Sequence, residues 1–294
     1  MEAGIALSIL VFGVILGATR YRVVERHILR VVFYILLPLT VCNAFLTVPL
    51  HWEMMYLPFY GLGLDVILAL IMLTLTRGLE NRLRGSMVIA SSTMNVGIFS
   101  IPFLKMFYGD LGIALATIFD VGNSFYVFFV CYLIASYFSG GEYSWRRNIL
   151  NYLSIPYVWA MLFALSIRSL EVKIPEYLFL FLTPSLLTPY LILVYLGIHL
   201  SMSFGRGFKK YLRNLLVLWI TKFSVGFIAG YLFGQLMMLE GDVADVVLTL
   251  SVLPPAFITM IYSEMMGLDL KYATFAVSTS IMIDIPILFM IAGI

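Results

Sequence analysis

Long apolar stretches separated by short polar breaks dominate the 294-residue chain. A helix needs about 20 mostly apolar residues to cross the hydrocarbon core of a bilayer, and ten windows of the sequence meet this requirement. Continuous apolar runs do not fit the alternating strands of a membrane barrel, so the pattern predicts an all-α fold. The predicted spans are 3–19, 28–48, 54–76, 86–107, 111–138, 149–168, 175–203, 214–238, 246–266 and 270–292.

The composition indicates that lipid is the solvent for most side chains. Hydrophobic residues make up 62% of the chain and charged residues 12%, whereas a soluble domain is nearer half apolar and a quarter charged. The net charge of +2, without a basic run carrying interleaved aromatic residues, gives no indication of a nucleic-acid partner. Cys42 and Cys131 lie in apolar stretches and are expected to be packing residues. No cofactor is expected, because His27, His51 and His199 show no metal-ligand spacing.

Lysine and arginine residues are distributed unevenly among the predicted loops. The loops after predicted helices 1, 3, 5, 7 and 9 carry 14 of them, and the opposite loops carry three. Cytoplasmic loops are the ones enriched in basic residues, so both termini are predicted to lie outside. Glu2 stands where a signal peptide would carry a basic residue, so we expect a retained first helix. The basic residues on the predicted inner side are Arg20, Arg22, Arg26, Arg30, Arg77, Arg82, Arg84, Arg146, Arg147, Arg206, Lys209, Lys210, Arg213 and Lys271.

The predicted topology divides the chain into two halves of opposite orientation. Ten helices and an external start place the first predicted helix outside-in and the sixth inside-out, which is typical of inverted-repeat transporters. We predict the two five-helix repeats to be 1–148 and 149–294. Weak internal similarity supports them, because Gly109 and Gly267 each follow a helix-breaking patch and lie 158 residues apart.

Helix-breaking residues lie near the middle of the fourth and ninth predicted helices. Pro102 is expected to interrupt the fourth, and Pro254 and Pro255 the ninth. Irregular backbone at membrane depth is tolerated where it is buried in protein or lines a cavity, and the half-helix that follows a break presents an N-terminus that favours an anion. An ordinary kink is the alternative for each single proline. The matched pair, with Asn95 and Thr259 nearby, favours a binding site.

Two ionisable residues lie in the middle of apolar helices. Asp65 falls in the third predicted helix and Lys222 in the eighth, at a spacing of 157 residues that is close to the repeat offset. Charged side chains at such depth normally face a cavity or one another, so we expect an ion pair behind the two broken helices. One possibility is a purely structural pair, in which each residue only neutralises the charge of the other. The other is a role in transport, in which Asp65 titrates or Lys222 exchanges Asp65 for a substrate carboxylate.

Other polar or small residues in the apolar helices give weaker signals. Asp120 and Asn123, one or two turns into the fifth helix, are expected to reach the break in the fourth, and the alternative is a helix cap near the outer interface. Asp284 in the last helix either pairs with Asn43 or faces a water-filled vestibule. Close helix packing is predicted at glycines spaced four apart, namely Gly13, Gly17, Gly226, Gly230 and Gly234.

Three segments carry a family resemblance: NVGIFSIP (95–102), the following YGDLGIALATIFDVGN, and LPPAFITMIYSEMMGLD near the end. In these segments the chain resembles the auxin efflux carrier family, within the larger group that includes bile-acid/sodium symporters. The resemblance covers essentially the whole chain in layout. It implies two inverted five-helix repeats, with helices 1, 2, 6 and 7 as a scaffold that often forms the dimer contact. Helices 3–5 and 8–10 would form a moving transport domain, in which helices 4 and 9 cross at their breaks.

The same resemblance implies roles for individual residues. Asn95 matches the family asparagine that contacts substrate, Pro102 matches the first crossing proline, and Asp65 matches the acid of a charged pocket beside the crossing. The chain departs from the plant members near Thr259, where a later crossing proline is replaced. Its loop between helices 5 and 6 is only SGGEYSWRRN. This short loop indicates a minimal, prokaryotic form, so auxin itself need not be the substrate.

These observations predict a secondary transporter that moves a small organic carboxylate across the plasma membrane by alternating access, as a homodimer embedded in the lipid bilayer. A sodium-coupled bile-acid-type symporter is one alternative, although no dense cluster of carboxylate and amide oxygens surrounds the breaks. A non-transporting carboxylate sensor is another. An intramembrane aspartyl protease is disfavoured because its Gly-x-Gly-Asp spacing is off by one, so no enzyme is expected. The predicted substrate residues are Asn95, Pro102, Asn123, Pro254, Pro255 and Thr259, and the predicted charge-coupling residues are Asp65, Lys222 and Asp120.

Overall fold

The computed structural model describes residues 2–18, 23–49, 52–140, 146, 149–150, 153–172, 174–202 and 208–293. The regular elements in these ranges are helical. Six described segments are long and apolar enough to cross a membrane, so the chain is a multi-pass integral membrane protein, and the predicted all-helical membrane fold is confirmed at that level. The ten-helix inverted repeat stays a prediction. The six segments are His27–Thr47, Met54–Leu75, Val96–Ser139, Phe179–Ser201, Phe208–Leu236 and Leu270–Ile291.

The chain forms two compact units, and each unit draws on both predicted halves. Unit 1 comprises Met1–Met54, Gly97–Ile118 and Ile155–Met202. Unit 2 comprises Met55–Val96, Phe119–Ser154 and Ser203–Ile294.

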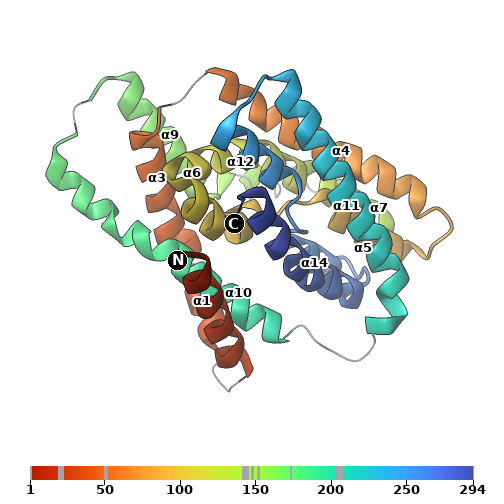
Figure 1. Ribbon diagram of the computed structural model, residues 1–294. Helices are drawn as coiled ribbons and strands as arrows, with labels where there is room; N and C mark the ends of the chain where they lie inside the picture. Colours follow the sequence, from red (N-terminus) through yellow and green to blue (C-terminus); the bar gives the residue numbers. More distant parts are fainter. Residues whose placement is uncertain are drawn as a thin grey trace. The chain divides into compact units, whose positions relative to one another are not determined.

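Unit 1 is built on the close packing of α1 along α10 and of α3 against α9 (Figure 1). A Cβ on Gly13 would lie 2.4 Å from the carbonyl oxygen of Val194, and one on Gly17 would lie 2.7 Å from that of Ile198. The predicted close packing at these two glycines is therefore confirmed. The elements of unit 1 are α1 (Glu2–Ala18), α2 (Val23–Val31), the π-helix η1 (Val32–Leu36), α3 (Leu37–Thr47), α9 (Pro156–Ser169), the 3₁₀-helix η5 (Glu176–Leu187) and α10 (Thr188–Met202), together with part of α6 (Ile101–Phe125); the 3₁₀-helix η2 (Trp52–Tyr56) leads into unit 2.

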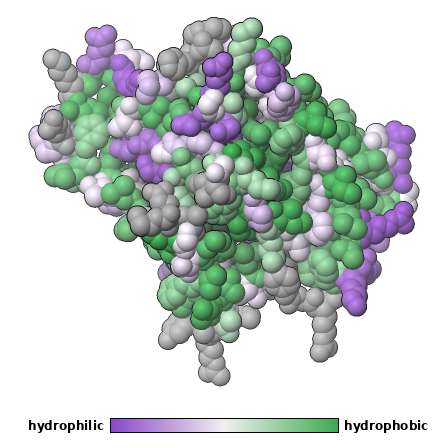
Figure 2. Space-filling model, in the orientation of Figure 1, coloured by the Kyte–Doolittle hydropathy of each residue, from purple (hydrophilic) through white to green (hydrophobic). Residues whose placement is uncertain are grey.

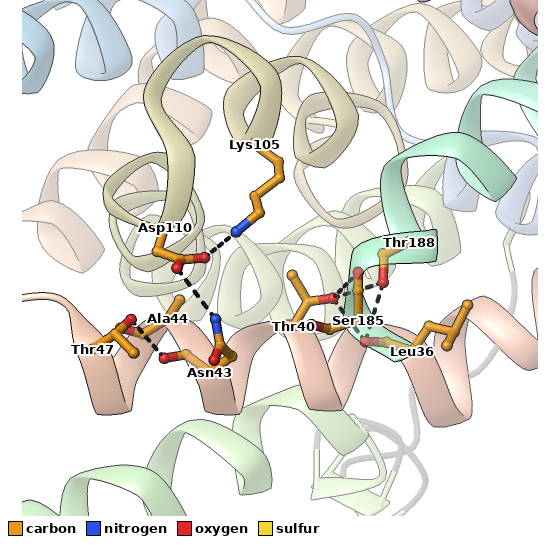
Figure 3. A network of polar contacts seen from close by, with 9 residues as sticks. All are labelled: Leu36, Thr40, Asn43, Ala44, Thr47, Lys105, Asp110, Ser185 and Thr188. Atoms are coloured by element: carbon orange, nitrogen blue, oxygen red, sulfur yellow. Dashed lines mark hydrogen bonds and ion pairs between the residues drawn. The ribbon is translucent and has the colours of Figure 1, made fainter. Parts of the chain in front are cut away.

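A polar network in unit 1 joins α3 to α6 (Figure 3). The side-chain amide of Asn43 donates to Asp110 at 3.2 Å, and Lys105 forms an ion pair with the same carboxylate. Along α3, the hydroxyl of Thr40 lies 2.7 Å from that of Thr188. Asn43 therefore binds Asp110 within unit 1, and its suggested pairing with Asp284 of unit 2 stays a prediction.

Unit 2 has a continuous core to which most of its helices contribute. Met72, Ala90, Tyr126, Leu215 and Tyr272 come from five elements and are all inaccessible to solvent. The elements are α4 (Leu57–Leu75), α5 (Asn81–Ser92), the end of α6, the π-helix η4 (Tyr126–Cys131), α7 (Tyr132–Ser139), α11 (Phe208–Leu236), α12 (Gly241–Ser251), α13 (Ile258–Met265) and α14 (Leu270–Ile291).

The outward faces of the unit 2 helices are apolar. Phe59 and Leu70 on α4, and Ile220 and Tyr231 on α11, are each more than half exposed. Apolar side chains cover much of the surface visible in Figure 2. Large exposed apolar area of this kind is what a lipid-facing surface requires.

The two glycine turns predicted from the internal similarity are confirmed. Gly109 has φ of 60° and ψ of −140°, so the long apolar segment Val96–Ser139 consists of two helical parts that meet at this residue. Gly267, between α13 and α14, has φ of 65°. Positive φ at both positions favours glycine, which lacks the Cβ that would clash there.

Basic helix starts gather at one end of unit 2. The backbone N–H of Asp269 donates to the carbonyl of Arg82 at 3.2 Å, and the Tyr211 hydroxyl donates to the Asp269 carboxylate at 2.9 Å. The starts of α5, α11 and α14 therefore lie together, as expected for a cytoplasmic end. Which side of the membrane this end faces stays a prediction, and Arg20, Arg22, Arg147 and Arg206 lie outside the described residues.

Candidate functional site

The first break in the candidate site is formed by residues 93–95. α5 ends at Ser92, and the π-helix η3 (Val96–Ser100) begins after the break and leads directly into α6. Pro102 was expected to make this interruption, but it is the second residue of α6 and belongs to unit 1. Because proline lacks an N–H and its ring clashes with the carbonyl four residues earlier, it accounts for the widened helix η3 and not for the break.

The second break is formed by residues 252–257, between α12 and α13. Pro254 and Pro255 lie inside it, so the predicted interruption of this helix is confirmed. Thr259 follows as the second residue of α13 and is fully buried.

The two breaks are in direct contact within unit 2. The backbone N–H of Asn95 donates to the carbonyl of Pro254 at 3.0 Å. The hydroxyl of Thr93 lies 2.8 Å from that of Thr259 and accepts from the N–H of Ala256 at 3.2 Å. Backbone groups freed by each break are thus satisfied partly by the other, as membrane depth demands.

Lys222 of α11 binds the broken end of α5. Its ammonium donates to the carbonyls of Ser91 at 3.0 Å and Thr93 at 2.9 Å, and it lies 3.2 Å from the sulfur of Met94. An ammonium has three N–H donors, and these three acceptors use all of them. A cation at the carboxyl end of a helix also complements the helix dipole. The predicted ion pair with Asp65 is therefore wrong, because the Lys222 ammonium forms its hydrogen bonds with the freed carbonyls of α5.

Asp65 and Asp284 are completely buried, and their carboxylate oxygens have no hydrogen-bond partner among the described residues. Asp65 lies within electrostatic range of Lys222 and Asp120, and Asp284 lies within range of Lys222. The described interior of unit 2 therefore holds an acidic cluster within electrostatic range of the Lys222 ammonium, whose hydrogen bonds go to the first break.

Asn123 of α6 holds both backbone groups of Met94 in the first break. Its side-chain oxygen accepts from the N–H of Met94 at 3.2 Å, and its amide donates to the Met94 carbonyl at 3.3 Å. The same amide donates to Asp120 at 2.6 Å. The predicted reach to the break is confirmed for Asn123, which also binds Asp120. The helix-cap alternative is wrong, because both residues are buried inside α6.

Asn95 provides an unused donor at the contact between the breaks. Its side chain is only 3% exposed, and its amide nitrogen Nδ2 has no hydrogen-bond partner in the described part of the chain. A buried amide without a partner costs about 1–3 kcal/mol, so such a group is retained where a ligand or function uses it.

One face of α11 positions both breaks. Lys222 binds the first break, and Gly226, one turn further on, packs against the end of α12 at the second. A Cβ on Gly226 would lie 2.1 Å from the carbonyl oxygen of Ser251, and Gly230 also faces Ser251 closely. The predicted close packing is confirmed at these two glycines, whereas Gly234 has no atom within 4 Å of a built Cβ.

Sequence reasoning missed the contribution of Thr93, although a signal for it was present. The run Ser91, Ser92, Thr93 is a polar interruption of an apolar helix, separated from Asn95 by Met94 alone. Hydroxyl side chains in membrane helices satisfy backbone groups that a break releases.

Neither a protein-family model nor a curated protein sequence matches this chain. The resemblance to the auxin efflux carrier family therefore stays a prediction carried by the three segments that contain the breaks. What the fold and the site define is a multi-pass membrane protein with two interrupted helices in contact, a free amide donor and a buried charge cluster.

Proposed function

We propose that this protein is a secondary transporter that moves a small organic carboxylate across the membrane by alternating access. The observation that carries the proposal is the unpartnered amide nitrogen of Asn95, placed where two interrupted helices meet. Discontinuous helices at membrane depth are the usual framework of transporter substrate sites. A merely structural kink would not require a buried donor to be left unsatisfied.

The chemistry of the site favours an anion with carboxylate oxygens. The nitrogen Nδ2 of Asn95 is a donor, and a carboxylate only accepts hydrogen bonds. The ammonium of Lys222 binds the carbonyl of Thr93, two residues before Asn95, and adds positive charge beside the same break. The helix that starts after Asn95 contributes the favourable end of its dipole.

The architecture that we propose is the ten-helix inverted repeat. Its support is the matching order of elements: α5, the first break and the Gly109 turn in one half, and α12, the second break, α13 and the Gly267 turn in the other. Unit 2 holds all the predicted site residues except Pro102, so we assign it as the transport domain. Unit 1 is assigned as the scaffold, with a dimer contact and a cell-membrane location as parts of the proposal.

The test measures substrate-induced current and uptake of isotope-labelled acid in proteoliposomes, across a panel of monocarboxylates and dicarboxylates, with and without pH and sodium gradients. Wild type is compared with Asn95→Ala and with the control Asn81→Ala, which alters an exposed asparagine at the start of α5. Loss of a hydrogen bond to a charged group costs about 1.5–3 kcal/mol, so Asn95→Ala should raise the half-saturating concentration about 10- to 100-fold. The control should match wild type.

The same experiment separates the alternative functions. A current that requires a sodium gradient would favour the bile-acid-type symporter over a proton-coupled or uncoupled carrier. Absence of both current and uptake for every acid, with folded protein that still binds an acid, would overturn the transport proposal in favour of a sensor.

A further inference from the structure

Two of the buried polar side chains of α14, those of Ser280 and Asp284, make no hydrogen bond to either break. Ser280 and Asp284 are both 0% exposed, and their spacing of four residues places them on the same face of the helix. The hydroxyl of Ser280 and both carboxylate oxygens of Asp284 have no hydrogen-bond partner among the described residues. Three unpartnered oxygens therefore lie along one buried stripe of α14.

The charges around Asp284 do not balance. Four helices, α5, α11, α12 and α13, pack against α14, and the charged group on them that acts on Asp284 is Lys222. Lys222 also acts on Asp65, and its N–H donors are bound to the first break. The other charged residues on these four helices are partly or fully exposed and include Arg82, Arg84, Asp242, Asp245 and Glu264.

One ammonium cannot compensate two buried carboxylates to which it donates no hydrogen bond. An ionised carboxylate without hydrogen bonds costs several kcal/mol in a protein interior, unless a cation or a proton neutralises it. Asp65 and Asp284 share this condition. Asp284 differs from Asp65 because another unpartnered oxygen, that of the Ser280 hydroxyl, lies on the same face of its helix.

We propose that Asp284 and Ser280 form a binding site for a monovalent cation, a proton or an alkali ion, separate from the anion site at the breaks. Three oxygens are fewer than hard metal cations usually take, which favours the proton. A cation on Asp284 neutralises a negative charge. Without that cation, the Asp284 carboxylate and a substrate carboxylate compete for electrostatic attraction to the Lys222 ammonium. Cation and substrate anion therefore strengthen each other's binding, and this coupling step rests on the proposed function.

The site itself is tested on ligand-free protein, without any transport measurement. Infrared spectra and thermal unfolding are recorded over a pH series in sodium, potassium or choline chloride, for wild type, Asp284→Asn and the control Asp245→Asn. For a proton, wild type and the control share a protonated-carboxyl C=O component that Asp284→Asn lacks, whatever band the equally buried Asp65 contributes. For an alkali ion, sodium or potassium raises the unfolding temperature of wild type and the control relative to choline, but not that of Asp284→Asn.

Ser280→Ala keeps the proposal testable if Asp284→Asn does not fold. Removing the neighbouring hydroxyl should shift the frequency of the Asp284 band or abolish the alkali-ion effect. Equal bands in wild type and Asp284→Asn, together with equal unfolding temperatures in all three salts, would overturn the site. An unchanged band and an unchanged alkali-ion effect in Ser280→Ala would overturn the part assigned to Ser280.

A flux measurement separates the failure of this inference from that of the transport proposal. If an acid is carried, wild type should accumulate it against its gradient when a pH or alkali-ion gradient is applied, and Asp284→Asn should only equilibrate it. Gradient-driven accumulation by Asp284→Asn would overturn the coupling. A positive infrared or unfolding result without any flux would support the cation site and overturn the transport proposal.

Discussion

The first break (93–95) and the second break (252–257) interrupt comparable helices in unit 2 but are stabilised by different groups. Side chains from distant helices hold the first: Lys222 binds the carbonyls at the end of α5, and Asn123 binds both backbone groups of Met94. The second contains Pro254 and Pro255, and its hydrogen bonds join it mainly to backbone groups and to the Thr93 hydroxyl. No proline lies in the first break.

This difference shows two ways of keeping a helix interrupted inside a membrane. In the second break, proline removes the N–H that a continuous helix would need, so the residues of the break themselves specify the interruption. In the first break, the local sequence permits a helix, and partners from α11 and α6 offer the backbone better hydrogen bonds. The first break therefore depends on tertiary contacts and should be the more sensitive of the two to substitutions elsewhere.

The largest effect on this comparison is expected from Lys222→Met. The change leaves the carbonyls of Ser91 and Thr93 without their partner and removes the positive charge that acts on both Asp65 and Asp284. Removal of one member of a buried charge cluster costs about 3–5 kcal/mol, so we expect a loss of this size in thermal or denaturant unfolding. Lys209→Met on the exposed start of α11 is the control, and equal losses in the two variants would refute the role of Lys222.

Gly226→Ala tests how closely the second break must approach α11. An added Cβ would lie 2.1 Å from the Ser251 carbonyl, which forces α12 to shift, and overpacking of this kind costs about 1–3 kcal/mol. Gly234→Ala is matched in helix and chemistry but meets no atom within 4 Å, so it should stabilise α11 by up to about 1 kcal/mol. Unfolding of both variants in the same detergent gives the comparison, and a result of the same sign would contradict it.

Asn123→Ala removes the second support of the first break. The N–H and carbonyl of Met94 lose their side-chain partner, at a cost of about 1–3 kcal/mol for buried groups left unsatisfied. Ser124→Ala is the control, because its hydroxyl contacts Asp120 and not the break. Faster hydrogen exchange of the Met94 amide in Asn123→Ala, but not in the control, would locate the effect. Unchanged exchange would show that the amide of Asn123 does not hold the break.

The smallest effect is expected from Pro254→Ala. Alanine retains the carbonyl that accepts from Asn95, so the contact between the breaks survives. The loss is mainly the restriction that proline places on the unfolded chain, about 0.4–1 kcal/mol. The free energies of unfolding of Pro254→Ala and Lys222→Met, measured together, show which break is the more sensitive to substitution. A larger loss of stability in Pro254→Ala would show that the second break is the more sensitive.

Several features of the fold were predictable because they depend on local properties of the chain. Apolar length predicted membrane helices, and the structure has six described segments that qualify. Gly109 and Gly267 were recognised as turns because positive φ favours glycine, and Gly13, Gly17, Gly226 and Gly230 were recognised as close contacts because only glycine leaves room for a neighbouring helix.

The candidate site was only partly predictable for the same reason. Pro254 and Pro255 marked the second break correctly, whereas Pro102 pointed to a widened helix instead of the first break. Asp65 and Lys222 were recognised as buried charges, but the partner of the lysine was wrong. Nothing in the sequence beside Lys222 shows that the carbonyls of Ser91 and Thr93, more than a hundred residues earlier, are released and compete for it.

The amino-acid sequence by itself determined that this chain is a multi-pass helical membrane protein, where the two glycine turns fall and which polar residues must be buried. Each of these follows from hydrophobic length, from the conformational range of a single residue or from the cost of a charge in lipid. Only the tertiary structure decided that Lys222 caps α5 and that, among the residues it describes, the Asn95 amide nitrogen and the carboxylates of Asp65 and Asp284 have no hydrogen-bond partner. In a membrane interior, each polar group forms hydrogen bonds with the best partner among the groups that the fold brings close to it. The residues next to it in the sequence do not reveal which groups those are.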